Sequence, residues 1–576
     1  MKNMKRIYKT DIIFLCALGI LLSNACTKNF EELNTDPKII GADLVDPGLI
    51  LTYVEWTGVV QASSYGNGTY GAFCGMDKRD DDAPFLETDA PGQWNFAYEV
   101  QLNNLSNIIQ LIEGKENKVE LANKQAIARI LKVWAMSKLT DTYGDVPYSE
   151  SCLPQELAVY QPKYDTQESI YTDLFKELKE AAAQLDASKV SYGAADLIYG
   201  GNVAKWKKLA NSLRLRLALR VRYADPALAR AQLSDLTEDG LMTTLNEDAY
   251  VLNNKDFPNH LNPRYYTYII SYSTISESVV THMVMINILL NDSINLDPRI
   301  KIYADTVKAT WKGGVSPNGY FFPDYEYRGS PTLGMVPVEY KYPWGAGTVS
   351  EISDFWRVPV VAPAIMRYSE VYFALAEAKL AGLLPAGFSG TAEAYYQKGI
   401  DASIEWYKWF YNLAAPQIPD LMLKYVHNSG YSPGTPWTDA DVQQYLEYKK
   451  IKDSEVDDFK ATAMYSLSGT AEEQLEKIIN QKIVALYPDE FQGWCEYRRT
   501  GYPRIPIGPD QAALAGVVPR REPWPTKEET INSKSFEEAL TRYGNDSRLT
   551  KFWWDANPNA PHKYIWTAPS MPTAFQ

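Results

Sequence analysis

The stretch Arg367-Tyr-Ser-Glu-Val-Tyr-Phe-Ala-Leu-Ala-Glu-Ala-Lys-Leu-Ala-Gly382 predicts the fold of this chain. It is rich in Ala and Leu, which are strong helix formers, and it ends at a glycine. After a Gly/Pro turn, a second helix is expected from Thr391 to about Leu413. The small residues Ala374, Ala378 and Ala402 would let two antiparallel helices pack closely. Such a pair is typical of one tetratricopeptide unit. Because the spacing of such units along this chain is irregular, the sequence predicts a degenerate helical-repeat array.

Helical periodicity also precedes this pair. The pattern is helical from about Trp94 to Leu139 and stops at residues 141–147, where Gly144 and Pro147 break it. Thr166 begins the next helix, which carries an apolar stripe at helical spacing as far as Leu185. A further helix is expected from about Glu472 to Tyr487, followed by a Pro/Trp-rich coil to the C-terminus.

Residues 213–222 alternate strictly between apolar residues and arginine or alanine, which taken alone predicts a strand. Leu, Arg and Ala are nevertheless helix formers, and only Val221 is β-branched. We therefore predict a helix whose arginines extend outward to solvent.

Residues from about 247 to 363 differ in character, with abundant Pro, Gly, Asn and aromatic residues. Loops of this length are uncommon unless they are functional. The predicted fold is therefore mostly α: a degenerate tetratricopeptide-like helical-repeat scaffold with a loop-rich, aromatic-rich insertion at 247–363. We expect strand only as short hairpins within that insertion.

The N-terminus has the pattern of an export signal. Basic residues between Lys2 and Lys9 precede an apolar run, and a small residue, Ala25, comes before Cys26. The run is too short to cross a bilayer. A cysteine at this place indicates a bacterial lipoprotein, with residues 1–25 as signal peptide, 26–46 as lipidated tether and 47–576 as the folded domain. An ordinary secreted protein with a coincidental cysteine is the alternative.

Composition narrows the function. The chain has 576 residues, a net charge of −14, 40 Tyr and 15 Trp. This charge argues against nucleic acid as a partner, because nucleic-acid binding needs basic patches. The other mature cysteines are scattered and show no metal spacing, so isolated thiols are expected. An acidic, aromatic-rich exported protein suits sugars or peptides, since rings stack on sugar faces and carboxylates accept from hydroxyls.

Catalytic and metal signals are weak. The four histidines, His260, His282, His427 and His562, show no paired spacing, and Asp77 with residues 80–82 lacks the spacing of an EF-hand. Residues 430–434 match a serine nucleophile motif, but Pro433 has no N–H to offer an oxyanion. We therefore expect neither a metal, a cofactor nor an enzyme. Paired carboxylates for glycoside hydrolysis stay open, because 71 acidic residues always offer a pair.

Specific strings resemble the SusD/RagB family of outer-membrane lipoproteins from Bacteroidetes. They lie at residues 26–37, at Lys138-Leu-Thr-Asp-Thr-Tyr-Gly-Asp-Val-Pro-Tyr148, at 368–378, at 481–487 and at Glu496-Tyr-Arg-Arg-Thr-Gly-Tyr-Pro503. Together and in this order they are specific. We expect the junction at 141–145 and the pair Arg498 and Arg499 to serve the fold, the arginines through ion pairs in the repeat core.

The resemblance implies a cell-surface lipoprotein without enzymatic activity. It would be acylated at Cys26, anchored in the outer membrane and facing the exterior. It would bind an oligosaccharide, or a peptide, and deliver it to a SusC-like TonB-dependent transporter. The alternatives are an α-helical toroid glycoside hydrolase and a helical-repeat adhesion or assembly scaffold.

The ligand is expected on the insertion, since loops on a rigid scaffold commonly carry binding. The family's ligand residues follow no motif, so the candidates rest on aromatic clustering, with Trp94 added because its flank indicates a helix entrance. For any one of these rings, packing of the insertion onto the helices is an equal alternative. The candidate ligand-binding residues are Trp311, Tyr320, Tyr325, Tyr327, Tyr340, Tyr342, Trp344, Trp356 and Trp94.

Overall fold

The fold was analysed in a computed structural model. It describes residues 45–62, 69–79, 91–266, 279–291, 295–306, 327, 329, 350–424, 438–505 and 517–561. From Gly48 onward these residues belong to one compact unit. The tether and the signal segment, including Cys26, lie outside the described residues apart from the tether's last two positions.

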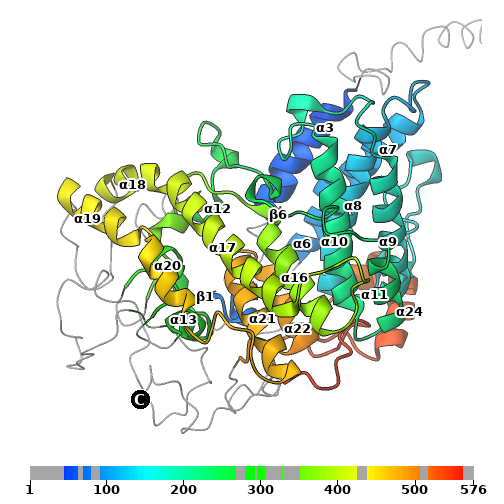
Figure 1. Cartoon of the computed structure of the whole chain (residues 1–576). Helices are drawn as coiled ribbons and strands as arrows, with labels where there is room; N and C mark the ends of the chain where they lie inside the picture. The colour runs from blue at the N-terminus through cyan, green and yellow to red at the C-terminus, as the bar shows by residue number, and fades with distance from the viewer. Residues whose placement is uncertain are drawn as a thin grey trace, which may run out of the picture. The chain divides into compact units, whose positions relative to one another are not determined.

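Helices make up most of the described chain (Figure 1). The longer ones are α7 (Asn103–Glu113), α8 (Ala122–Tyr143), α9 (Gln167–Gln184), α10 (Val203–Val221), α11 (Pro226–Leu233), α13 (Met283–Leu290), α16 (Tyr368–Leu380), α17 (Ala392–Ala414), α19 (Asp439–Lys449), α20 (Asp453–Lys460), α21 (Ala471–Leu486), α22 (Glu490–Thr500) and α24 (Ser533–Tyr543). Shorter helices are α3 (Pro47–Tyr53), α5 (Thr69–Cys74), α6 (Pro91–Phe96), α12 (Pro263–Tyr265), α14 (Ile300–Tyr303), α18 (Ile418–Lys424) and α23 (Glu528–Ile531).

The helices pack as a chain of neighbours. Helix α8 lies between α7 and α9, α9 packs on α10, and α10 contacts α16 (Figure 1). Helix α16 then packs against α17 and α21, and α21 contacts α22. This succession of helices confirms the mostly helical scaffold.

The predicted pair 367–413 forms α16 and α17. Ala374, Ala378 and Ala402 are buried, as expected of close-packed positions. Gly399 of α17 faces Phe373 of α16, and a Cβ at Gly399 would lie 2.9 Å from the Phe373 ring. The close approach of these two helices therefore depends on small side chains.

Helix α9 begins where the sequence predicts it. The Thr166 hydroxyl accepts a hydrogen bond from the backbone N–H of Ser169 (3.3 Å) and so caps the helix. Helix α8 ends at Tyr143, and Gly144 follows with φ 83°. Glycine adopts this left-handed conformation without a steric penalty, so Gly144 stops the helix as predicted.

Residues 213–222 are helical, as predicted, but their arginines do not extend to solvent. Arg214, Arg216 and Arg220 are buried, and each pairs with a carboxylate. The outward orientation was wrong because carboxylates from distant parts of the chain, such as Glu370, reach these arginines inside the core.

Strand is sparse among the described residues, but it is not confined to the insertion. Three short antiparallel pairs occur: β1 (Asp77–Arg79) with β5 (Val279–Thr281), β2 (Val146–Pro147) with β3 (Tyr164–Asp165), and β4 (Ala249–Tyr250) with β6 (Ala364–Met366). The prediction of local hairpins was wrong, because β1–β5 and β4–β6 join segments more than a hundred residues apart. These pairs fasten the loop-rich segment to the scaffold.

The C-terminal part holds more helix than predicted. Helices α22 and α24 follow α21, where the sequence suggested mainly coil. Every residue of α22 is buried, so it lacks the polar face that makes a helix visible in a sequence. No helix among the described residues has the length and hydrophobicity needed to cross a membrane.

Candidate ligand-binding site

Most of the predicted ligand-binding aromatics lie outside the described residues. Those six are Trp311, Tyr320, Tyr325, Tyr340, Tyr342 and Trp344. Tyr327, Trp356 and Trp94 are described, and all three are buried, at 1%, 3% and 5% exposure. Buried rings stack on neighbouring side chains, so these three contribute to packing in this structure.

Trp356 joins the loop-rich segment to α17. Its ring stacks on Phe410, with centroids 4.3 Å apart, and lies edge-on to Tyr487 at 4.8 Å. Its indole N–H donates to the carbonyl of Ile302 (2.9 Å). The Asn262 amide donates to the Trp356 carbonyl (2.8 Å), which ties together two parts of the loop-rich segment.

The other two rings have similar roles. Trp94 meets Tyr143 of α8 edge-on, with centroids 5.1 Å apart. The hydroxyl of Tyr327 lies 2.8 Å from that of Tyr448 on α19. The structure thus places these three candidates apart, each against a different helix.

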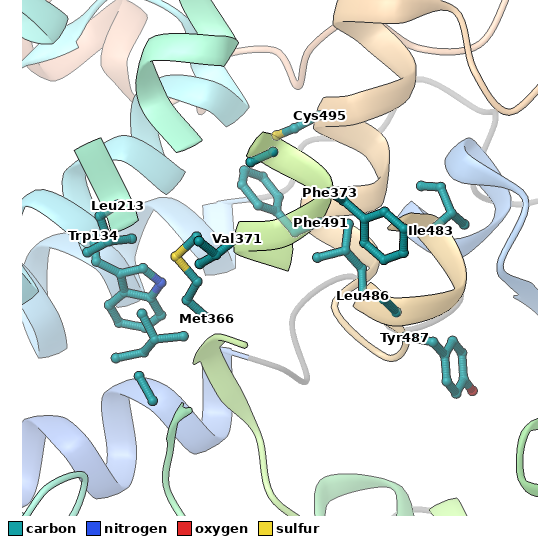
Figure 2. Close-up of a cluster of buried hydrophobic side chains, with 14 of the residues drawn as sticks. Trp134, Leu213, Met366, Val371, Phe373, Ile483, Leu486, Tyr487, Phe491 and Cys495 are labelled. Carbon is teal, nitrogen blue, oxygen red and sulfur yellow. The ribbon is translucent and has the colours of Figure 1, made fainter. Parts of the chain in front are cut away.

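A central pocket lies where α8, β6, α16 and the turn between α21 and α22 meet. Its enclosed volume is about 60 Å³, and the figure becomes about 740 Å³ when the open solvent at its mouth is counted. Figure 2 shows Trp134 on one side and Met366, Leu486 and Phe491 across from it. The lining comprises Val59, Tyr70, Trp134, Lys138, Arg216, Pro363, Ala364, Ile365, Met366, Arg367, Glu370, Ala485, Leu486, Pro488, Asp489, Glu490 and Phe491.

Lys138 is the polar feature of this pocket that distinguishes it from ordinary core. Its ammonium nitrogen lies 5.4 Å from the ring centroid of Trp134 and 5.2 Å from that of Phe491. Among the described residues, no carboxylate or hydrogen-bond acceptor is within bonding distance of it. Burial lowers the pKa of Lys138, and Asp489 partly offsets this effect. Two aromatic rings therefore hold a cation whose hydrogen-bonding capacity the described protein leaves unused.

Two carboxylates of the pocket are neutralised by guanidinium groups. Glu370 accepts from Arg216 Nε (2.7 Å), and Glu490 accepts from Arg264 (2.6 Å). Burial would raise the pKa of Glu370, but Arg216 and Lys482 together lower it. Glu370 therefore stays ionised and has no proton to donate to a substrate.

Asp489 and Arg367 complete the charged lining. Asp489 caps α22, accepting from the backbone N–H of Gln492 (3.3 Å), and burial raises the pKa of its carboxyl group. Arg367 donates to the carbonyls of Ala485 (2.9 Å) and Tyr487 (2.8 Å). Its guanidinium stacks on Trp406 at 3.5 Å, and this ring lines the adjoining pocket.

A second, apolar pocket adjoins the first and shares Pro363 and Pro488 with it. Its walls include Trp356, Trp406 and Phe410, whose rings stack on one another. The loop-rich segment thus supplies Pro363 to the first pocket and most of the lining of the second. The sequence did not single out Lys138, although its position one helical turn after Trp134 on a buried helix was visible.

The junction at 141–145 and the residues Arg498 and Arg499 serve the fold. Asp141 pairs with Arg220, and Asp145 accepts from the backbone N–H of Gln167 (2.9 Å) at the junction of α8 and α9. Arg499 pairs with Glu377 and Glu496, which confirms its predicted ion pairing. Arg498 instead donates to backbone carbonyls, including that of Asp141 (2.6 Å), and stacks on Trp494.

Metal and nucleophile chemistry gain no support in the described part of the chain. There, no group of three His, Cys, Asp or Glu side chains is arranged to hold a metal. Asp77 is buried and paired with Arg264 (2.9 Å), whereas residues 80–82 lie outside the described ranges. The serine motif at 430–434 and His427 also lie outside them. Cys74, Cys152 and Cys495 are free thiols.

Comparison with known proteins identifies the family. The family model described as "Starch-binding associating with outer membrane", of SusD-like type, matches residues 85–525. A solved chitin-binding protein shares 26% identity and a TM-score of 0.67, covering 89% of this chain and 100% of its own. No curated protein sequence matches the chain.

Two further solved structures agree. A chitin-binding SusD homologue from Flavobacterium johnsoniae is 25% identical, with a TM-score of 0.61 over 89% of this chain and 98% of its own. A SusD homologue from Bacteroides fragilis, at 21% identity, shares the fold, with a TM-score of 0.67 over 89% of this chain and 100% of its own. From the family match over most of its length, we conclude that the chain belongs to the SusD-like family.

Proposed function

We propose that this protein is a cell-surface lipoprotein that binds a nutrient, an oligosaccharide or a peptide, and delivers it to a SusC-like TonB-dependent transporter. The family match over residues 85–525 carries this proposal. The export signal and Cys26 support the anchor. The aromatic-rich insertion and the two pockets beside it offer rings and polar groups suited to sugars.

The anchor is tested through Cys26. Replacing it, Cys26→Ala, removes the thiol that would be acylated, so the protein should move from the outer-membrane fraction to the soluble fraction. Fractionation of cells and labelling with a palmitate analogue measure this. Cys152→Ala, which removes a half-buried thiol of the folded domain, is the matched control and should leave both unchanged. Membrane retention and labelling of Cys26→Ala would contradict the anchor.

Ligand binding is proposed to depend on the aromatic residues of the insertion that lie outside the described ranges. Trp311 and Trp344 are the residues chosen for substitution by alanine. Truncating a stacking ring costs roughly 1–3 kcal/mol by analogy with base stacking, so the affinity for the ligand should fall about 5- to 150-fold. Calorimetric titration with an oligosaccharide panel measures this. Chito-oligosaccharides come first in the panel because two solved relatives are chitin-binding proteins.

The variants need a control that removes an aromatic ring elsewhere. Tyr160 is 95% exposed and lies between α8 and α9, so Tyr160→Ala removes a surface ring without disturbing the core. The affinity of Tyr160→Ala for the oligosaccharide should equal that of the unmodified protein. Unchanged affinity of the Trp311→Ala, Trp344→Ala double variant in a folded protein would move the site away from the insertion.

A glycoside hydrolase is the second candidate, because Glu370, Asp489 and Glu490 line one pocket. Hydrolysis needs one carboxyl group that donates a proton and a second that is ionised. Glu370 is held by Arg216, which lowers the pKa of its carboxyl group and disfavours the protonated form, and Glu490 is bound to Arg264. We expect no shortening of oligosaccharides during prolonged incubation, as followed by chromatography. Shortened oligosaccharides that form with the unmodified protein but not with Asp489→Asn would instead favour a glycoside hydrolase.

A further inference from the structure

The lining of the central pocket includes two cations that make no ion pair with the described residues. In all, the lining holds three cations and three carboxylates. The pairs Arg216–Glu370 and Arg264–Glu490 neutralise two of these carboxylates. Lys138 and Arg367 make no ion pair with the described residues, and Asp489 is the remaining carboxylate. Two cations therefore face one carboxylate, inside a protein whose net charge is −14.

The two cations differ in what they can still bind. Arg367 donates from Nη1 to the carbonyls of Ala485 and Tyr487, and its guanidinium carbon lies 3.5 Å from the ring centroid of Trp406. Lys138 touches only ring faces, and an ammonium group has three N–H donors and no acceptor. Partial burial removes some of the water around this ammonium and the described part of the protein offers it no acceptor, so the site favours a ligand group that brings one. Lys138 is half-buried, and so is Asp489 at the rim, which leaves the ammonium within reach of a ligand.

We propose that the central pocket binds a carboxylate group of the ligand, with Lys138 as its anchor. The carboxylate accepts from the Lys138 ammonium, and the flanking rings of Trp134 and Phe491 exclude water and stack on the adjoining part of the ligand. The carboxylate belongs to an acidic sugar, such as a uronic acid, or to the C-terminus of a peptide. This inference rests on the proposed nutrient-binding function and specifies its ligand as acidic.

Calorimetric titration with paired probes tests the inference. Trigalacturonate is compared with neutral α-1,4-galactotriose, and trialanine with trialanine amide, so that each pair differs in its carboxylates. One acidic probe should bind at least about ten-fold more tightly than its neutral partner, as expected of a charge-assisted hydrogen bond. The sugar pair and the peptide pair distinguish the two sources of the carboxylate.

Two variants connect the preference to the pocket. Lys138→Met keeps a long apolar side chain and should abolish the preference for the acidic probe, whereas Lys138→Arg should retain part of it. Lys124→Met is the matched control: Lys124 lies on the same helix over the ring of Tyr192, outside the pocket. It should bind both probes as the unmodified protein does.

The outcomes separate this inference from the proposed function. Equal binding of acidic and neutral probes, or an acidic preference that survives in folded Lys138→Met, would overturn the inference and leave nutrient binding standing. Binding of no sugar and no peptide, in the broad panel or in these pairs, would overturn both. Loss of the preference for the acidic probe in Lys138→Met, together with its retention in Lys124→Met, would establish the site.

Discussion

The helical scaffold and the loop-rich segment at 350–363 are both largely buried and both contain buried ion pairs, such as Arg357–Glu351 in the segment, but they meet their neighbouring helices in different ways. In the scaffold, α10, α16, α21 and α22 meet through ion pairs, such as Arg216–Glu370 and Arg499–Glu377. The loop-rich segment meets α17 through rings, with Trp356 stacked on Phe410. A buried guanidinium that loses its carboxylate is left with an uncompensated charge, whereas stacked rings tolerate small displacements.

This difference fits the demands on the two regions. We infer that the ion pairs fix the register of the helices, because a shift of one helix would separate these buried charges from their partners. Ring contacts are less directional, so the loop-rich segment can adapt in sequence and shape while staying attached. The central pocket lies at their boundary, where Lys138 and Arg367 come from helical or helix-flanking positions and Pro363 from the end of the loops.

The largest effect is expected from breaking the scaffold's charge network. Glu377 is fully buried and pairs with both Arg499 and Arg222. Glu377→Ala leaves Arg222 without its ion pair and Arg499 with Glu496 alone, so it should lower the free energy of unfolding by about 3–5 kcal/mol. Urea denaturation measures the loss.

An exposed ion pair provides the contrast. Lys118 and Glu113 are 3.1 Å apart with about half of each side chain exposed (52% and 54%). Lys118→Ala should change the free energy of unfolding by less than about 1 kcal/mol, because water screens such pairs. Similar losses in Lys118→Ala and Glu377→Ala would refute the role assigned to the buried network.

The junction between the loop-rich segment and the scaffold should make the stability of the protein depend on pH. Asp248 precedes β4 and accepts from the backbone N–H of Tyr368 at the start of α16 (2.6 Å). Burial, opposed by that hydrogen bond and by Arg367, raises the pKa of Asp248 from 3.8 to about 8. Between these values the folded protein holds a proton that the unfolded chain has lost. The free energy of unfolding therefore falls as pH rises, by up to about 1.4 kcal/mol per pH unit.

Asp248→Asn removes this titration and keeps the acceptor for Tyr368. Melting temperatures recorded from pH 5 to pH 8 should decline less steeply for Asp248→Asn than for the unmodified protein. Parallel declines of the two would show that Asp248 is ionised in the folded state throughout.

A smaller effect is expected for the ring contacts. Trp356→Phe keeps an aromatic ring but loses volume and the hydrogen bond to the Ile302 carbonyl, so unfolding should become easier by about 1–2 kcal/mol. Chemical denaturation with equal m-values would confirm a simple stability change. A loss as large as that of Glu377→Ala would erase the contrast between the regions.

Local signals in the sequence predicted the helices well. The Thr166 cap and the small residues between α16 and α17 act over a few positions and are visible without a structure. The burial of Arg216 was not predictable, because its partner Glu370 lies 154 residues away. Helix α22 was missed for a related reason: it is buried on all sides and shows no amphipathic period.

The candidate site was likewise predictable from the sequence only in part. Clustering of rings identified an aromatic-rich insertion, but clustering alone cannot separate a ring that faces a ligand from one such as Trp356 that stacks on α17. Lys138 escaped notice because its significance depends on what surrounds it. Trp134 is four residues away, but Phe491 and Asp489 come from the far end of the chain.

Hydrogen–deuterium exchange with and without the tightest-binding oligosaccharide or peptide of the probe sets tests the central claim most directly. The ligand should slow exchange within residues 307–349 and in the α21–α22 turn at 485–491, while the polar groove between α8 and α9, lined by Arg129, Tyr148 and Glu177, stays unchanged. Protection confined to that groove, with none in the insertion or the turn, would contradict binding at the boundary of loops and scaffold.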